Sequence, residues 1–165
     1  MEFDLNLTIR ILTSIGFGFM LGLEREVTGK FAGLRTHILV SAGACVFTLL
    51  SIYGFNYAIS DGLNGVNDPA RIAAQIITGI GFIGAGTVMR HGTTVSGITT
   101  AATLWISAAI GMTCGCGMYY LAGLVTVLTL VILIAIRYFE RSVIIRKMSS
   151  RRKKMCENIE NPHTF

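Results

Sequence analysis

Charged residues are scarce in this sequence. Only 14% of its 165 residues are Asp, Glu, Lys or Arg, and 52% are apolar, whereas a water-soluble domain usually carries about 25% charged residues. This composition excludes an ordinary soluble domain and indicates a protein whose solvent is lipid. Proline is also scarce, at two residues, while glycine is abundant, at 19. That balance suits closely packed membrane helices.

Basic residues are missing from most of the chain. Of the 14 Lys and Arg residues, eight lie between Arg137 and Lys154, so the net charge of +5 belongs to a tail and excludes a basic face for nucleic acid. Beside a membrane, such a run is attracted to anionic lipid by about 1 kcal/mol per charge. Docking on an acidic protein surface is the alternative.

The four cysteines lack the spacing of a metal site or a disulfide framework. They are Cys45, Cys114, Cys116 and Cys156. The C-G-C stretch is interpreted as ordinary residues at a membrane edge, because no companion His or Cys completes a site. A redox-active pair is the alternative.

Five apolar runs are long enough, or nearly so, to cross a bilayer. Crossing takes about 20 residues, because the hydrocarbon layer is about 30 Å thick and a helix rises about 1.5 Å per residue. We therefore predict an all-α integral membrane protein with a membrane domain at residues 1–136 and a basic cytoplasmic tail at 137–165. The predicted spans are residues 5–23, 37–59, 70–89, 98–113 and 118–136.

The connecting segments predict the orientation. Lys and Arg follow the first, third and fifth runs, while the alternate segments carry none. By the positive-inside rule, the N-terminus lies outside and the C-terminus lies in the cytoplasm.

Glycines in the third run match a nucleotide-binding pattern, G-x-G-x-x-G, at Gly79, Gly81 and Gly84. That fingerprint requires a preceding strand and an acidic residue about 20 positions later. Both are missing here, so the match is attributed to glycine density. No nucleophile–base pair emerges either, and neither an enzyme nor a cofactor is predicted.

On a helix, these glycines fall on two faces at about 100° per residue. Gly79 and Gly86 share one face with Gln75 and Arg90, and Gly81 and Gly84 lie on the opposite side with Ala85. Each face can receive a neighbouring helix at close range, and Gly18 and Gly22 of the first run offer a partner surface. The alternative is a helix broken at 79–86 that exposes its backbone to an ion path.

Polar residues gather at the predicted cytoplasmic side. They are Glu24, Arg25, Glu26, Lys30, Arg35, His37 and Arg90. We expect an ion-pair network that fixes helix ends, with an ion-binding or partner-docking mouth as the functional alternative. Glu24 and Glu26 are two residues apart and point to different faces, so they do not chelate one metal together; whether a metal binds stays open.

A second polar group is predicted at the outer end of the third helix. Arg71 and Gln75 lie one turn apart there. Arg71 either anchors this helix end or reaches Asp68 or Asp61.

Several separated blocks resemble the MgtC/SapB family of bacterial membrane proteins. They are G-L-E-R-E at 22–26, G-K-x-A-G-L-R-T-H at 29–37, R-I-A-A-Q-I-I-T-G-I-G-F-I-G-A-G at 71–86 and V-S-G-I-T-T-A-A-T-L-W at 95–105. The resemblance implies a five-span inner-membrane protein linked to magnesium homeostasis and to growth in low magnesium or inside macrophages. It also implies inhibition of the F-type ATP synthase by binding within the membrane.

The leading hypothesis is therefore a non-enzymatic membrane protein that modulates a membrane complex, such as the F-type ATP synthase, through helix–helix contacts. The alternative is a small oligomeric channel or transporter for Mg²⁺ or protons. Virulence-type members carry a soluble domain after the fifth span, whereas this sequence continues into a basic tail, so it looks like a short member.

Overall fold

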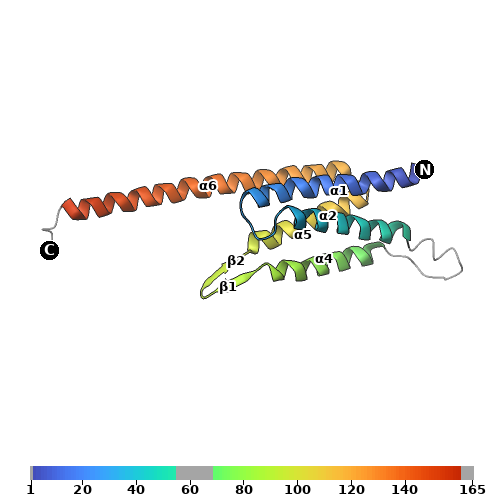
Figure 1. Cartoon of the computed structure of the whole chain (residues 1–165), viewed down its shortest axis with the longest axis horizontal. Helices are drawn as coiled ribbons and strands as arrows, with labels where there is room; N and C mark the ends of the chain where they lie inside the picture. The colour runs from blue at the N-terminus through green and yellow to red at the C-terminus, as the bar shows by residue number, and fades with distance from the viewer. Residues whose placement is uncertain (1, 55–68, 161–165) are drawn as a thin grey trace. The chain divides into compact units, whose positions relative to one another are not determined.

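The computed structural model describes residues 2–54 and 69–160 (Figure 1), and nearly all of them are helical. The helices are α1 (Glu2–Val27), α2 (Leu34–Leu49), a π-helical turn η1 (Leu50–Gly54), α4 (Pro69–Gly86), α5 (Ile98–Gly115) and α6 (Tyr119–Glu160). A short hairpin of β1 (Met89–His91) and β2 (Thr94–Ser96) joins α4 to α5.

The chain divides into two compact units within α6, at residues 1–127 and 128–165. In the first unit, α2 packs against both α1 and α5, α1 also contacts α5, and α4 lies mainly on α5. The second unit continues α6 as a helix to Glu160. Apolar side chains of this helix such as Val131 and Ile132 are exposed, as expected for a surface in lipid.

Within the described residues, four helical segments are long and apolar enough to cross a membrane. They are Phe3–Val27, Leu34–Gly54, Ile98–Gly115 and Tyr119–Glu140. The apolar part of α4, Ala70–Gly86, is shorter, and its 17 residues extend about 26 Å against a hydrocarbon layer of about 30 Å. The fold is thus that of a helical membrane protein, and the predicted starts of the spans at 70 and 98 agree with the helices.

The prediction of a helix up to residue 89 is wrong for its last three residues. Helix α4 ends at Gly86, and Met89–His91 then pairs antiparallel with Thr94–Ser96. The β-branched residues that follow the helix favour strands. The helical period had placed Arg90 on the same helix face as Gly79. Arg90 instead lies on β1.

Two glycines shape this hairpin. Gly92 is the first residue of the two-residue loop and has φ 62°, as the tight primed hairpin turns require. Gly97 precedes α5 with φ 89°, and a Cβ there would overlap the carbonyl oxygen of Thr87. Only glycine fits this close return of the chain.

Small residues bring α1 close to α2. A Cβ on Gly18 would lie 2.9 Å from the His37 carbonyl oxygen, and one on Gly22 would lie 2.7 Å from Leu34 Cα. The predicted partner of these glycines was the third helix; the structure instead places α2 against them. Helical period identifies a smooth face, but it does not identify the neighbour.

Glycines also allow close contact between α2 and α5. A Cβ on Gly111 would overlap the Ser41 carbonyl oxygen, and one on Gly115 would lie 2.7 Å from Thr48 Cβ. Helices α1, α2 and α5 therefore form a tightly closed core, in which Gly18, Gly22, Gly111 and Gly115 are in close contact with a neighbouring helix.

Candidate functional site: a buried polar cluster, an open helix face and a groove

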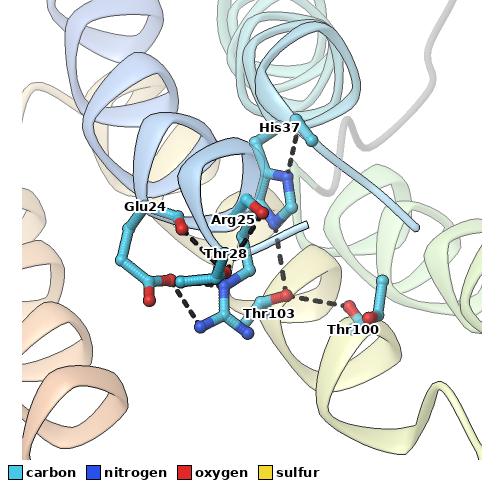
Figure 2. A network of polar contacts seen from close by, with 7 residues as sticks. Glu24, Arg25, Thr28, His37, Thr100 and Thr103 are labelled. Carbon is cyan, nitrogen blue, oxygen red and sulfur yellow. Dashed lines mark hydrogen bonds and ion pairs between the residues drawn. The ribbon is translucent and has the colours of Figure 1, made fainter. Parts of the chain in front are cut away.

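A buried polar cluster joins the ends of α1, α2 and α5 (Figure 2). His37 is fully buried, with its Nδ1 2.9 Å from the Gly33 carbonyl oxygen and its Nε2 3.2 Å from Thr103 Oγ1. Thr103 Oγ1 also lies 2.9 Å from the Thr100 carbonyl oxygen. This hydrogen-bond chain thus links the start of α2 to α5.

The protons in this chain have two consistent arrangements. Because the Gly33 carbonyl can only accept, Nδ1 of His37 carries a proton in both. If Thr103 donates to the Thr100 carbonyl, Nε2 must donate to Thr103 and the imidazole is charged. If Thr103 donates to Nε2, the imidazole is neutral and the Thr100 bond is lost. A single hydroxyl rotation therefore accompanies protonation of His37.

The charged pair of the cluster lies within α1. The Arg25 guanidinium pairs with the Glu24 carboxylate, and the two side chains are only 4% and 8% exposed. Thr28 Oγ1 donates to the Glu24 carbonyl oxygen at 2.8 Å. Removing one member of a buried pair usually costs about 3–5 kcal/mol, so each of these two charges depends on the other for its stability at the end of α1.

The other predicted members of this polar group have separate positions. Glu26 Oε2 accepts a hydrogen bond from the Leu34 backbone N–H at 3.0 Å, so this carboxylate caps α2 and complements its N-terminal dipole. Lys30, Arg35 and Arg90 are exposed. The structure thus brings Glu24, Arg25 and His37 together and leaves the three remaining cations at the surface.

No resident metal site is evident in the described part of the chain. Among the side chains that the structure describes, no three of His, Cys, Asp or Glu are grouped closely enough to hold a metal ion. The Glu24 carboxylate is engaged by Arg25, and the Glu26 carboxylate by the start of α2.

Arg10 has a role that the sequence did not reveal. Its Nη1 donates to the Gly115 carbonyl oxygen at 2.6 Å, its Nε donates to Asn6 Oδ1 at 2.8 Å, and the guanidinium lies 5.6 Å from the centre of the Tyr53 ring. A cation at the C-terminal end of α5 satisfies its last carbonyls and its dipole. Because Gly115 lies 105 residues away, no local pattern could predict this contact.

Hydroxyl groups lie in the interior of the helix bundle, between the His37 cluster and the Arg10 contact. Ser41 Oγ donates to the Ser14 carbonyl oxygen at 3.0 Å and lies 3.0 Å from Ser14 Oγ. Ser107 on α5 is also fully buried, and its Oγ has no hydrogen-bond partner among the described residues.

Helix α4 leaves one face open. Gly84 meets Ala101 of α5 at 3.5 Å from its Cβ position, but no described atom outside its own helix lies within 4 Å of a Cβ on Gly81. The helical period places Ala74, Thr78, Gly81 and Ala85 on a common face, and all four are exposed. We call these four residues the open α4 face.

A groove lies between α2 and α4 and has a volume of about 480 Å³. Val40, Gly43 and Phe47 line it from α2, and Gln75 and Gly79 are among its α4 residues. We call it the α2–α4 groove. A Cβ on Gly43 or Gly79 would meet no described atom within 4 Å; the same is true of Gly86, which the lining does not include.

Gln75 is the polar side chain among the described lining residues of the α2–α4 groove. Arg71 is exposed in the first turn of α4, one turn before Gln75. The two acidic residues predicted as partners of Arg71, Asp61 and Asp68, lie outside the described residues.

These features define a helical membrane protein with a glycine-packed core of three helices and a fourth helix that lies loosely against it. The model of the MgtC family matches residues 11–142. The chain belongs to the MgtC family.

Similar proteins come from several bacteria. The chain is 48% identical over 123 residues to a protein of Escherichia coli (strain K12) named "Putative magnesium transporter YhiD", covering 74% of this chain and 56% of that protein. It is 43% identical over 122 residues to Protein MgtC of Salmonella typhimurium (strain LT2), covering 74% and 48%. An uncharacterised Synechocystis protein is 41% identical over 129 residues, covering 78% and 51%.

The chain thus spans about half the length of the curated relatives it matches. No solved structure matches the chain.

Proposed function

We propose that this protein is a non-enzymatic, multi-pass protein of the bacterial inner membrane that serves magnesium homeostasis. It acts through helix–helix contact with another membrane complex, and the F-type ATP synthase is the first candidate. The observation that carries this proposal is the open α4 face, because its small residues are exposed and Gly81 has no described neighbour.

The contrast between two sets of glycines supports the proposal. Gly18, Gly22, Gly111 and Gly115 are all used in contacts between α1, α2 and α5, whereas Gly81 is not. In lipid, helices associate through close packing and backbone approach, and small residues at i, i+4, i+7 and i+11 provide a smooth face for it. Ala74 to Ala85 extend along about 16 Å of α4, which is enough to receive a crossing helix.

The assignment to magnesium homeostasis rests on relatives. The Escherichia coli relative carries "magnesium transporter" in its name, and the blocks at 22–37, 71–86 and 95–105 resemble the MgtC/SapB family. The chain covers about half of these relatives, and we propose that it shares their link to magnesium.

The proposed topology has five crossings. Helix α4 provides the fifth despite its length of about 26 Å, since flanking residues and local thinning accommodate a small mismatch. The N-terminus lies outside, while the hairpin with Arg90 and the basic tail lie in the cytoplasm. The tail then rests on anionic lipid of the inner leaflet.

Affinity purification in mild detergent tests the partner. Wild-type protein should enrich ATP-synthase membrane subunits, and Gly81→Leu should lose them, because leucine prevents close approach at the open α4 face. The control is Gly16→Leu on α1, since Gly16 is also exposed with no described atom within 4 Å of its Cβ position. Absence of ATP-synthase subunits from the wild-type sample would refute this partner.

Growth in low magnesium tests the physiological part of the proposal. A deletion strain carrying wild-type protein or Gly16→Leu should grow, and one carrying Gly81→Leu should not. Normal growth with Gly81→Leu would show that the open α4 face has no role in magnesium homeostasis.

The buried hydroxyl groups favour a second candidate, an oligomeric channel or transporter for Mg²⁺ or protons. Ser14, Ser41, Ser107 and Thr103, with His37, form a polar interior in a protein otherwise built from apolar side chains. Purified protein in liposomes should then carry a Mg²⁺ or proton flux that His37→Ala removes. Liposomes with no flux would reject this candidate.

A further inference from the structure

We propose that the α2–α4 groove binds one acyl chain of an anionic phospholipid, with the lipid phosphate held by Arg71 at the start of α4. This site goes beyond the proposed function and does not depend on it. The groove uses the face of α4 with Gln75 and Gly79, whereas the open α4 face with Gly81 is a different side of the same helix.

The dimensions of the groove fit an alkyl chain. Its lining on α4 runs from Ile72 to Ile83, which is about 16 Å and corresponds to about one leaflet of the hydrocarbon layer. The groove has a volume of about 480 Å³, and one acyl chain of a phospholipid spans about one leaflet.

The chemistry of the groove follows the order of groups in a phospholipid. Arg71 is exposed in the first turn of α4, and helical side chains lean toward the N-terminus, so its guanidinium reaches the interface and can pair with a phosphate. Gln75, one turn deeper, has amide donors for an ester carbonyl. Below it the described lining is apolar, including Ile76, Ile80 and Ile83.

Two glycines keep this space open. Gly43 on α2 and Gly79 on α4 both line the groove, and a Cβ on either would meet no described atom within 4 Å. A larger side chain at these positions can therefore enter the groove without displacing a helix. In other parts of the core, glycine is needed because helices touch; here its absence of a side chain leaves room for a ligand.

The chain-binding part is tested by filling the groove. Wild type, the Gly43→Leu/Gly79→Leu double variant and Gly81→Leu are purified in detergent and titrated with phosphatidylglycerol. Bound lipid is counted by native mass spectrometry. Because leucine replaces several buried methylenes of the acyl chain, the double variant should bind phosphatidylglycerol at least about tenfold more weakly. Gly81→Leu should bind like wild type.

The head-group part is tested with Arg71→Gln. Wild type should prefer phosphatidylglycerol over phosphatidylcholine, and the variant should lose about tenfold in affinity for phosphatidylglycerol alone. Since Arg71 is exposed, this change leaves the helix packing intact. It keeps the proposal testable even if the double glycine variant fails to fold, which far-UV circular dichroism would reveal.

Equal binding of phosphatidylglycerol by wild type and the folded double variant would overturn the acyl-chain site. Equal binding of both lipids by wild type, or no effect of Arg71→Gln, would overturn the anionic head-group site. A wild-type dimer that the double variant converts to monomer would assign the groove to a second copy instead. None of these results bears on the ATP-synthase contact, which Gly81→Leu tests separately.

Discussion

The close contact at Gly22 predicts that Gly22→Ala lowers the free energy of unfolding. A Cβ on Gly22 would lie 2.7 Å from Leu34 Cα, whereas ordinary contacts begin at 3.4 Å, so Gly22→Ala must separate α1 from α2 by about 0.7 Å there. Overpacking usually costs about 1–3 kcal/mol. The two nearest atoms at this site belong to the Leu34 backbone, and His37 Cβ follows at 3.1 Å, so the upper half of that range applies. Better helix propensity of alanine returns about 1 kcal/mol, which leaves a net loss of about 1–2 kcal/mol.

Gly81→Ala is the matched comparison. The same change in propensity applies, but no described atom lies within 4 Å of the new methyl group, so this variant should gain up to about 1 kcal/mol. Reversible unfolding in mixed micelles, with increasing dodecyl sulfate and far-UV circular dichroism as the signal, measures both free energies of unfolding. Equal stability of the two variants would refute the assignment of Gly22 to a close α1–α2 contact.

Three further predictions concern other contacts. A double-mutant cycle with Ser14→Ala and Ser41→Ala should give a coupling free energy of about 0.6–1.7 kcal/mol in the same unfolding assay, as for other hydrogen bonds between membrane helices; additive effects would contradict the bond. Arg10→Met should lower the free energy of unfolding by about 1.5–3 kcal/mol, because the Gly115 carbonyl loses a charged donor, and an unchanged value would argue against the cap. Exposed Cys116, left as the only cysteine, should react with a membrane-impermeant maleimide in intact spheroplasts, whereas labelling only after permeabilisation would reverse the proposed orientation.

The helices could be predicted because lipid imposes their length. A bilayer requires about 20 apolar residues per crossing, and runs of this length can be recognised in the sequence alone. The run at 98–113, for example, became a helix at Ile98–Gly115. The hairpin after Gly86 was missed because its strands are only three residues long, and a three-residue run carries no usable period.

The contacts were harder to predict than the helices. Helical period identified Gly18 and Gly22 as a smooth face but gave no information about which helix would cover it. For Gly79 and Gly81, the same period suggested two close-packing faces, yet the described helices leave both glycines without a neighbour within 4 Å. Such assignments require three-dimensional information, because a sequence pattern describes one helix at a time.

The polar cluster was predicted only in part. The shared cytoplasmic side of the helices indicated that Glu24, Arg25 and His37 would gather, but Lys30, Arg35 and Arg90, which were expected there too, lie at the surface. The sequence could not show that Glu26 would cap α2, or that Thr103, 66 residues from His37, would complete the hydrogen-bond chain. Contacts between residues so far apart in the sequence depend on which helices pack against each other.

Photo-crosslinking at Phe82 tests the central claim most directly. Phe82 is 84% exposed on α4, next to Gly81, and a photoreactive benzoyl-phenylalanine can replace it without filling the open α4 face. In cells, this probe should form one discrete adduct with an ATP-synthase membrane subunit, and Gly81→Leu should abolish it. The same probe at Phe19 of α1, which is 43% exposed, should form none. An absent adduct at Phe82, or the same adduct from both positions, would contradict a partner contact at α4.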